Sequence, residues 1–212
     1  RQGRVHLQQS DSDHGDLMER LDNILEECRS VCDRWPCLVV GGGVRDLLLN
    51  AEPQDYDVFF LGSSSEELRD LFRPVSVDMH QPYRRSGNLC GEIIIDGDLV
   101  QVCQTDALTL DDMFDRTDWN ASLFGYDGTR VEQRVELDHV RPGQRLRLMN
   151  ISNPINTLGR GFRLAERLSM VFHVQDVLRL CRMITDSPRP ERVRVRSRRS
   201  RRPAAVGTIS RI

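Results

Sequence analysis

The sequence contains no lysine, and all 30 of its basic residues are arginine. A Walker-type phosphate loop needs a Lys followed by Ser or Thr after its last glycine, so that class of nucleotide site is excluded. The Gly-x-Gly-x-x-Gly fingerprint of dinucleotide-binding folds is absent as well. The arginine bias is typical of a GC-rich genome and does not indicate a particular chemistry.

The sequence also lacks a run of eighteen apolar residues and a signal-peptide pattern. We therefore expect no membrane-spanning segment and a cytoplasmic location. The six cysteines contain no C-x-x-C pair, which favours buried reduced thiols over a metal site or disulfides; they are Cys28, Cys32, Cys37, Cys90, Cys103 and Cys181. A chain of 212 residues is long enough for one main domain with an appendage.

Charge is distributed unevenly along the chain. Residues 187–212 contain nine Arg and one Glu, a balance of +8, whereas the whole chain carries −2, so the other 186 residues carry −10. This Pro-, Ser- and Arg-rich tail is expected to be disordered when free. Such clusters commonly bind nucleic acid through its phosphates. We predict RNA contact by the tail, with a merely solubilising segment as the alternative.

The most informative stretch is residues 38–60, where an apolar strand leads into three glycines and a short helix at 44–50. Glycine can adopt backbone angles closed to other residues and lets a phosphate approach the main chain. The start of the helix offers unpaired N–H groups, and Arg45 adds a fork-shaped donor for phosphate oxygens. We predict that Gly42, Gly43 and Arg45 hold a triphosphate.

Two carboxylates open the strand that follows. Asp55 and Asp57 alternate along this strand, so their side chains point to the same face. Paired carboxylates of this kind can hold Mg²⁺, and in a two-metal site the ions stabilise the attacking and leaving oxygens of a phosphoryl displacement. A glycine triplet alone is usually a tight turn, and Asp-x-Asp alone is usually a solvated strand end. Their ordered combination predicts a nucleotidyltransferase with Asp55 and Asp57 as catalytic metal ligands.

These motifs resemble a known family. GGGVRDLLLN followed by DYDVFF is similar to the head domain of class II tRNA nucleotidyltransferases (CCA-adding enzymes) and bacterial poly(A) polymerases, within the DNA polymerase beta-like superfamily. Two further blocks agree: RTDWNASLFGYD at 116–127 and the arginine-rich RGFRLAERL at 160–168. The resemblance implies that an NTP and an RNA acceptor, possibly tRNA, are the partners. It further implies that Arg116, Asp118, Arg160 and Arg163 position the ribose, base or phosphates.

The chain departs from the family pattern at several positions. Thr117 replaces an arginine of the second block, and Asn120 and Ser122 stand where Thr and Asn are usual. Asn153 and Asn156 replace the Asp and Arg that pair with the incoming base in the family, so the base preference is left open. Asn carries both a donor and an acceptor, so base recognition can still occur here.

A third acid would be expected on the strand pair at 91–106, whose Asp96–Gly97 turn is a strong hairpin signal. In polymerase-type sites this acid removes the proton of the acceptor hydroxyl. The aligned residue is Gln101, which cannot act as a base. Asp98 lies close to the turn and is expected to be solvated.

The arginine-rich segment is expected to form a helix. Arg160, Arg163 and Arg167 lie at i, i+3 and i+7, on one helix face. A solvated basic face would explain this pattern. The alternative is that Arg160 and Arg163 reach the triphosphate or the base from across the cleft. A further helix is predicted at 171–184.

The predicted fold is α+β, a polymerase beta-like nucleotidyltransferase head with a short mixed sheet and flanking helices, followed by a short helical neck. We place the head domain at residues 1–150, the neck at 151–186 and the Arg-rich tail at 187–212. The predicted function is Mg²⁺-dependent, NTP-dependent nucleotidyl transfer to an acceptor, in the first place an RNA 3′ end. The alternatives are modification of a protein or small molecule, and a non-catalytic RNA-binding relative. The sequence leaves the oligomeric state open.

Overall fold

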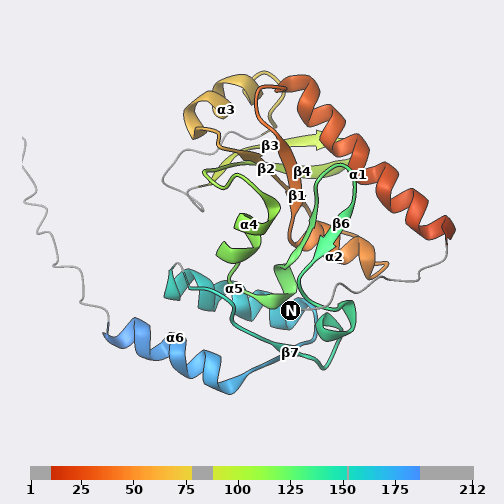
Figure 1. Ribbon diagram of the computed structural model, residues 1–212. Helices are drawn as coiled ribbons and strands as arrows, with labels where there is room; N and C mark the ends of the chain where they lie inside the picture. The colour runs from red at the N-terminus through yellow and green to blue at the C-terminus, as the bar shows by residue number, and fades with distance from the viewer. Residues whose placement is uncertain (1–10, 78–87, 152, 187–212) are drawn as a thin grey trace, which may run out of the picture.

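The computed structural model describes residues 11–77, 88–151 and 153–186, with side chains from residue 15 onward. It is a mixed α+β fold built on a six-stranded sheet (Figure 1). The helices are α1 (Asp11–Val31), α2 (Gly42–Leu48), α3 (Ser65–Phe72), α4 (Leu110–Arg116), α5 (Pro154–Arg167) and α6 (Val174–Asp186). The strands are β1 (Cys37–Val40), β2 (Tyr56–Leu61), β3 (Leu89–Ile95), β4 (Asp98–Thr105), β5 (Phe124–Tyr126), β6 (Val131–Gln133), β7 (Arg145–Leu146) and β8 (Val171–Phe172). The predicted fold class is confirmed.

The sheet has the strand order β3-β4-β2-β1-β5-β6. The pair β1 and β2 is antiparallel, with Leu38 opposite Phe59, whereas β2 and β4 are parallel. The predicted hairpin is present as β3 and β4, and its turn places Asp96 and Gly97 at φ 49° and 92°. Positive φ at both central residues is the requirement of the tight hairpin turns that Asp-Gly favours.

The two faces of the sheet are covered to different extents. Apolar residues of α1 and α3 pack on one face against Tyr56, Val58 and Phe60, forming the larger core. Residues of α4 pack on the other face against Leu38, Val40 and Leu61, forming a smaller core. Alternation along each strand explains this division, since successive side chains point to opposite faces. The sheet therefore lies between two separate apolar cores.

The C-terminal helices lie together below the sheet, away from α1 and α3 (Figure 1). Helix α5 docks on Trp119, whose indole N–H donates to the carbonyl of Thr157 at 2.9 Å. A Cβ on Gly161 would lie 2.4 Å from this indole, so only glycine allows the close approach. The predicted helix at 171–184 begins later, at Val174, because Val171 and Phe172 pair with β7. None of the described helices is long and apolar enough to cross a membrane.

Candidate active site at the glycine-rich turn

The glycine-rich turn and the paired carboxylates lie at the same edge of the sheet. Because β1 and β2 are antiparallel, the end of β1 at Val40 meets the beginning of β2 at Tyr56. Gly41 has φ 99°, a conformation that L side chains rarely adopt, and its N–H donates to Phe124 at 2.7 Å. A Cβ on Gly41 would lie 3.9 Å from Oδ2 of Asp57. The backbone of the turn therefore lies beside one of the two predicted metal ligands.

Gly43 fixes the distance between α2 and β2. A Cβ at this position would come within 2.7 Å of the Tyr56 ring and 2.9 Å of the Asp55 carbonyl oxygen. Contacts this short do not occur in folded proteins, so a side chain here would push the strand that carries Asp55 away from the turn. Gly42 has more space, since its nearest neighbour would be Nη2 of Arg45 at 3.4 Å. The two glycines predicted to bind phosphate thus have different structural roles.

Arg45, predicted to contact phosphate, is buried beneath the turn. Its side chain is fully buried, and it donates to the carbonyl of Ala121 at 2.9 Å and twice to Oδ1 of Asp46, at 2.8 and 2.5 Å. The guanidinium is directed under the turn and is not presented at the surface. In this structure Arg45 supports the backbone of the turn, and its donors are engaged by the protein itself.

The other oxygen of Asp46 accepts a hydrogen bond from Arg167 of α5 at 2.6 Å. Asp46 therefore links the buried Arg45 to a helix that begins more than a hundred residues later. The sequence contained both residues, but sequence reasoning missed this contact. The arginine spacing placed Arg167 on a helix face, and no local pattern indicated that the Asp following Arg45 would be its partner.

Asp55 and Asp57 are half-buried; Asp57 lies in β2, and Asp55 directly precedes this strand, so the two alternate along the chain as predicted. Burial and the neighbouring Asp55 raise the pKa of Asp57 to about 7, and Arg160 partly opposes the rise. Burial also raises the pKa of Asp55, against the attraction of Arg167. Two neighbouring carboxylates whose pKa values are both raised are a suitable donor set for a divalent cation, which would neutralise both. The described residues contain no cluster of three metal-ligating side chains, so Mg²⁺ would need further ligands from phosphate or water.

Asp118 and Arg160, predicted from separate blocks, are in contact. Nη1 of Arg160 donates to Oδ1 of Asp118 at 3.3 Å. Asp118 is buried, and burial raises its pKa while Arg160 lowers it. Arg160 also lowers the pKa of Asp57 through its charge. Its side chain is 52% exposed and accessible to a ligand.

The structure does not bring the other two predicted arginines into this group. Arg116 forms an ion pair with the exposed Asp106 at the end of α4. Arg163 is exposed on α5, near Gly159. Asn153 is the N-cap of α5, and its side-chain oxygen accepts the N–H of Asn156 at 3.1 Å. Base recognition by Asn153 would have to use its amide NH₂ group, because this oxygen caps the helix.

The structure also shows where Gln101 and Asp98, the two positions considered for a third acid, lie relative to Asp57. Gln101 is the neighbour of Asp57 on β4, which agrees with the alignment drawn from the sequence. Asp98, which was expected to be solvated, is paired with Arg20 at 2.8 and 2.5 Å. That pairing removes Asp98 from the group around Asp57.

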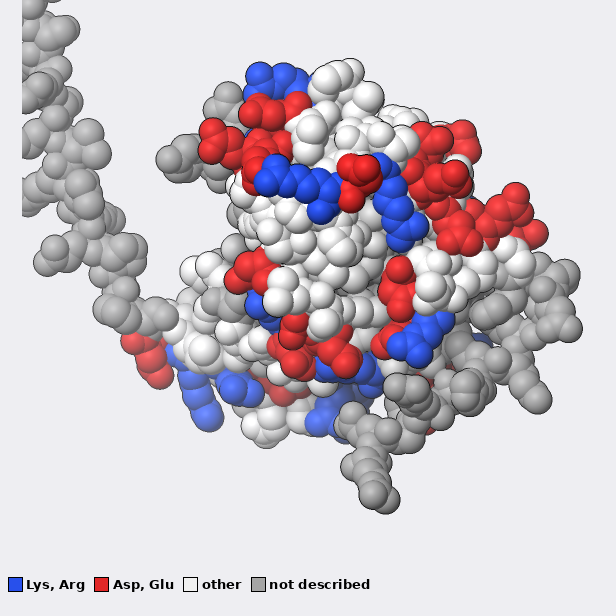
Figure 2. Space-filling model, turned by 45° about the horizontal axis from the view of Figure 1, so that its top comes forward, with Lys and Arg blue, Asp and Glu red and all other residues white. Residues whose placement is uncertain are grey.

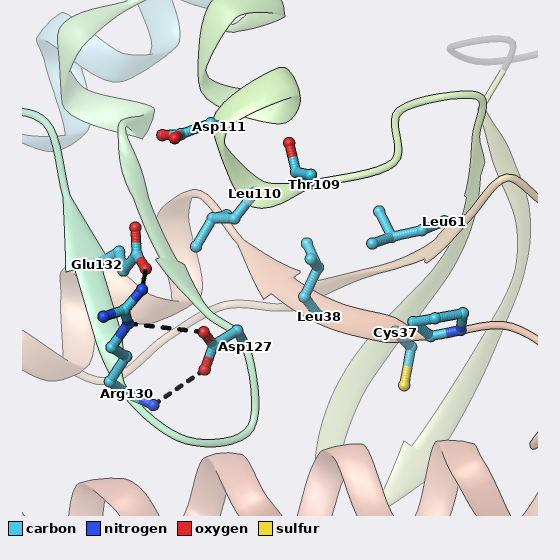
Figure 3. A pocket seen from close by; sticks show the side chains of 10 residues that line it. Cys37, Leu38, Leu61, Thr109, Leu110, Asp111, Asp127, Arg130 and Glu132 are labelled. Atoms are coloured by element: carbon cyan, nitrogen blue, oxygen red, sulfur yellow. Dashed lines mark hydrogen bonds and ion pairs between the residues drawn. The ribbon is translucent and has the colours of Figure 1, made fainter.

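A pocket of about 360 Å³ lies at the opposite end of the strands (Figure 3). Its wall includes Cys37 and Leu61, the residues of β1 and β2 furthest from the glycine turn. Three of the charged side chains in it are paired with one another, as Arg130 contacts Asp127 and Glu132. It is therefore separate from the carboxylate pair.

The region around the glycine turn and the carboxylate pair matches a known protein family. Residues 37–105 match the family model described as the poly A polymerase head domain, and this part of the chain is thus similar to a nucleotidyltransferase head. The match spans β1, the glycine turn, the carboxylate pair and the β3–β4 hairpin. No match was found among curated protein sequences.

Solved structures of CCA-adding enzymes share the fold. One with ATP has a TM-score of 0.56 at 15% identity, covering 82% of this chain and 45% of that one. The Thermotoga maritima enzyme complexed with tRNA has a TM-score of 0.51 at 18% identity, covering 82% and 42%. The Bacillus stearothermophilus enzyme with CTP has a TM-score of 0.52 at 13% identity, covering 84% and 45%. The chain spans less than half the length of these enzymes.

Proposed function

We propose that this protein transfers a nucleotide from an NTP to an acceptor, and that the acceptor is an RNA 3′ end. The observation that carries the proposal is the position of the Gly41 backbone beside Asp57, on the strand face shared with Asp55. Phosphate needs close access to the backbone and a cation to neutralise it, and this edge of the sheet offers both. The head-domain match at residues 37–105 supports the same reaction class.

Asp55 and Asp57 are the residues that would hold Mg²⁺. When bound there, the cation would neutralise charge on the phosphates and on the two aspartates. Gly41 and Gly42 would give the triphosphate access to the main chain, as glycine does where a ligand approaches closely. Arg160 would contact the phosphates or ribose from α5, since it is half exposed and held by Asp118. Arg45 contributes by supporting the turn from below.

The RNA acceptor is supported by features outside the carboxylate pair. A relative of the same fold has been solved complexed with tRNA. Arginines gather on the C-terminal helices, with Arg160, Arg163 and Arg167 on α5 and Arg179 and Arg182 on α6. Figure 2 shows basic side chains at the lower left, where α6 lies, and acidic ones at the upper right, along α1. Residues 187–212, which lie outside the described residues, contain nine further Arg.

The proposal is tested by incubating the full chain with each labelled NTP, Mg²⁺ and total small RNA. The expected result is label on RNA, abolished by Asp55→Asn and Asp57→Asn. Label on a protein or a small molecule instead would reassign the acceptor. Absence of incorporation together with salt-sensitive RNA binding would identify a non-catalytic RNA-binding protein and overturn the enzymatic proposal.

A further inference from the structure

Charge changes sign along the chain at about residue 142. Residues 1–142 contain 14 Arg and 28 acidic residues, a balance of −14, whereas residues 143–185 contain seven Arg and two acidic residues, a balance of +5. The basic part comprises β7, α5, β8 and α6, which lie together below the sheet (Figure 1). A polyanion is attracted to one side of such a molecule and repelled by the other, so the division of charge orients it on approach.

The arginines of the basic part differ from the others in their partners. Seven arginines outside this part form ion pairs with carboxylates: Arg20, Arg34, Arg73, Arg116, Arg130, Arg134 and Arg141. Among the described residues, no carboxylate pairs with five exposed arginines of the basic part: Arg145, Arg147, Arg163, Arg179 and Arg182. Their planar, forked guanidinium groups thus keep their donors for an outside anion, and this fork fits two phosphate oxygens.

The two arginines of β7 point outward. Leu146, which lies between them, is fully buried and is paired in register with Phe172 of β8. The centre of the Phe172 ring lies 5.8 Å from that of Trp119. Since successive side chains of a strand point to opposite faces, Arg145 and Arg147 lie on the face of the β7–β8 pair that is turned away from Trp119.

Helix α6 follows this outer face directly. Strand β8 ends one residue before α6 begins, and the N–H of that residue, His173, donates to the carbonyl of Leu146 at 3.1 Å. Leu180 is the buried residue of α6, whereas Arg179 and Arg182 on either side of it are exposed. Arg145, Arg147, Arg179 and Arg182 are called the arginine surface below.

The two acidic residues of the basic part do not pair with this surface. Oδ2 of Asp176 accepts the N–H of Leu148 at 3.0 Å and lies 3.4 Å from Nδ1 of His173. Glu166 is exposed on α5 and forms no ion pair with an arginine of the described residues. The positive charge of the arginine surface is therefore not balanced by carboxylates beside it.

We propose that the arginine surface binds phosphates of the RNA acceptor upstream of its 3′ end. The inference rests on the proposed function, in which the 3′ end itself lies at Asp57. The arginine surface is turned away from Trp119, and the next residue along the chain from Trp119 is Asp118, which contacts Arg160. The surface therefore meets nucleotides further along the strand, and because it contacts phosphates, it binds them without regard to sequence.

The first test measures RNA affinity against salt concentration in the absence of NTP. The probe is a stem-loop RNA with a single-stranded 3′ end, titrated into the full chain. We expect Arg145→Gln/Arg147→Gln to bind it about tenfold more weakly at about 0.1 M salt. The slope of log Kd against log salt concentration should fall by about 1.5, because each phosphate contact contributes about 0.7 to 0.9. Arg179→Gln/Arg182→Gln should behave in the same way.

The matched control is Arg34→Gln/Arg73→Gln, which removes the same charge from two exposed, ion-paired arginines. Its Kd and salt slope should stay within error of the wild type, and melting temperatures check that all three variants fold. An equal loss in the control would overturn the inference, because only net charge would then matter. Unchanged salt slopes in both arginine-surface variants would also overturn it, and so would tighter binding of the wild type to anionic lipid vesicles than to the RNA.

A second test separates the arginine surface from the reaction. The KM for the stem-loop RNA should rise about tenfold in Arg145→Gln/Arg147→Gln with kcat unchanged, whereas a dinucleotide acceptor should be used equally by variant and wild type. An equal rise in KM for the dinucleotide would contradict binding upstream of the 3′ end. If the wild type binds RNA with the expected dependence on the arginine surface but incorporates no nucleotide, the proposed function fails and the RNA-binding surface stands.

Discussion

Arg167 on α5 donates a hydrogen bond to Asp46 on α2 at 2.6 Å, and Asp46 in turn neutralises the fully buried Arg45. This contact joins the helix that carries Arg160 to the turn that carries the glycines. A single carboxylate, which is 2% exposed, thus links the phosphate-facing turn to the basic helix.

Asp46 and Arg167 should differ in their effect on stability. Asp46→Asn leaves the charge of Arg45 buried without a counter-ion, and breaking a buried pair in this way costs about 3 kcal/mol of the free energy of unfolding. Arg167→Met should cost about 1 kcal/mol, because Arg167 is 30% exposed and Asp46 keeps Arg45 as a partner. Urea unfolding of both variants measures the difference. Equal losses would show that Arg45 does not depend on Asp46.

The two glycines of the turn should tolerate a methyl group unequally. Gly43→Ala places a Cβ 2.9 Å from the backbone oxygen of Asp55, so we expect a loss of about 2 kcal/mol together with displacement of Asp55. Gly42→Ala meets only the end of the Arg45 side chain at 3.4 Å and should cost less than about 1 kcal/mol. Thermal unfolding and Mg²⁺ titration would distinguish them. A Gly43→Ala variant as stable as the wild type would contradict the close packing of α2 on β2.

Arg160 and Arg163 provide a matched pair on the same helix. Arg160 donates a hydrogen bond to Asp118 and lowers the pKa of Asp57, whereas Arg163 is exposed. We expect Arg160→Met to weaken NTP binding about tenfold, which corresponds to about 1.4 kcal/mol, the scale of a hydrogen bond to a charged group. Arg163→Met should leave NTP binding within twofold of the wild type. Equilibrium titration with a fluorescent NTP is the measurement, and the reverse order would contradict the placement of Arg160.

The raised pKa of Asp57 predicts a pH-dependent stability of the metal-free protein. The pKa of Asp57 is about 7 in the folded protein and 3.8 in the unfolded chain. Between these two pH values the folded state therefore binds a proton that the unfolded state has lost. The contribution of Asp57 to the free energy of unfolding therefore falls as the pH rises from about 4 to about 7, and it is constant above that. Asp57→Asn should be about 1–2 kcal/mol more stable than the wild type at pH 8, after discounting for solvent screening, and equally stable at pH 4.

Mg²⁺ provides the control for this effect. At pH 8 the cation should raise the melting temperature of the wild type, because it neutralises the ionised pair. It should leave the Asp57→Asn variant nearly unchanged. A wild-type protein whose stability is independent of pH between 4 and 8 would show that Asp57 has an ordinary pKa.

The sequence predicted the elements that rest on local patterns. The glycine turn, the alternating Asp55 and Asp57, and the Asp96–Gly97 hairpin are each specified by a few adjacent residues, and all are present. The fold class was expected from the family that these motifs resemble. The contact between Asp118 and Arg160 was anticipated only as two positions in one site.

Interactions between distant segments could not be read in this way. The sequence predicted a phosphate contact for Arg45 and did not indicate its burial, in which Asp46 and Ala121 accept its hydrogen bonds under the turn. The helix expected from Val171 begins at Val174, because Val171 and Phe172 form strand β8 and pair with β7. Likewise, the sequence did not indicate that Glu92 lies opposite Gln101 in the sheet.

The central claim is nucleotidyl transfer dependent on Asp55 and Asp57, and the position of the transferred phosphorus tests it most directly. The full chain is incubated with Mg²⁺, RNA and an NTP labelled with radioactive phosphorus at either the α or the γ position. The account predicts that the α label is incorporated into RNA with release of pyrophosphate, that the γ label is not, and that Asp57→Asn abolishes incorporation. Transfer of the γ label, or α incorporation that persists in Asp57→Asn, would contradict it.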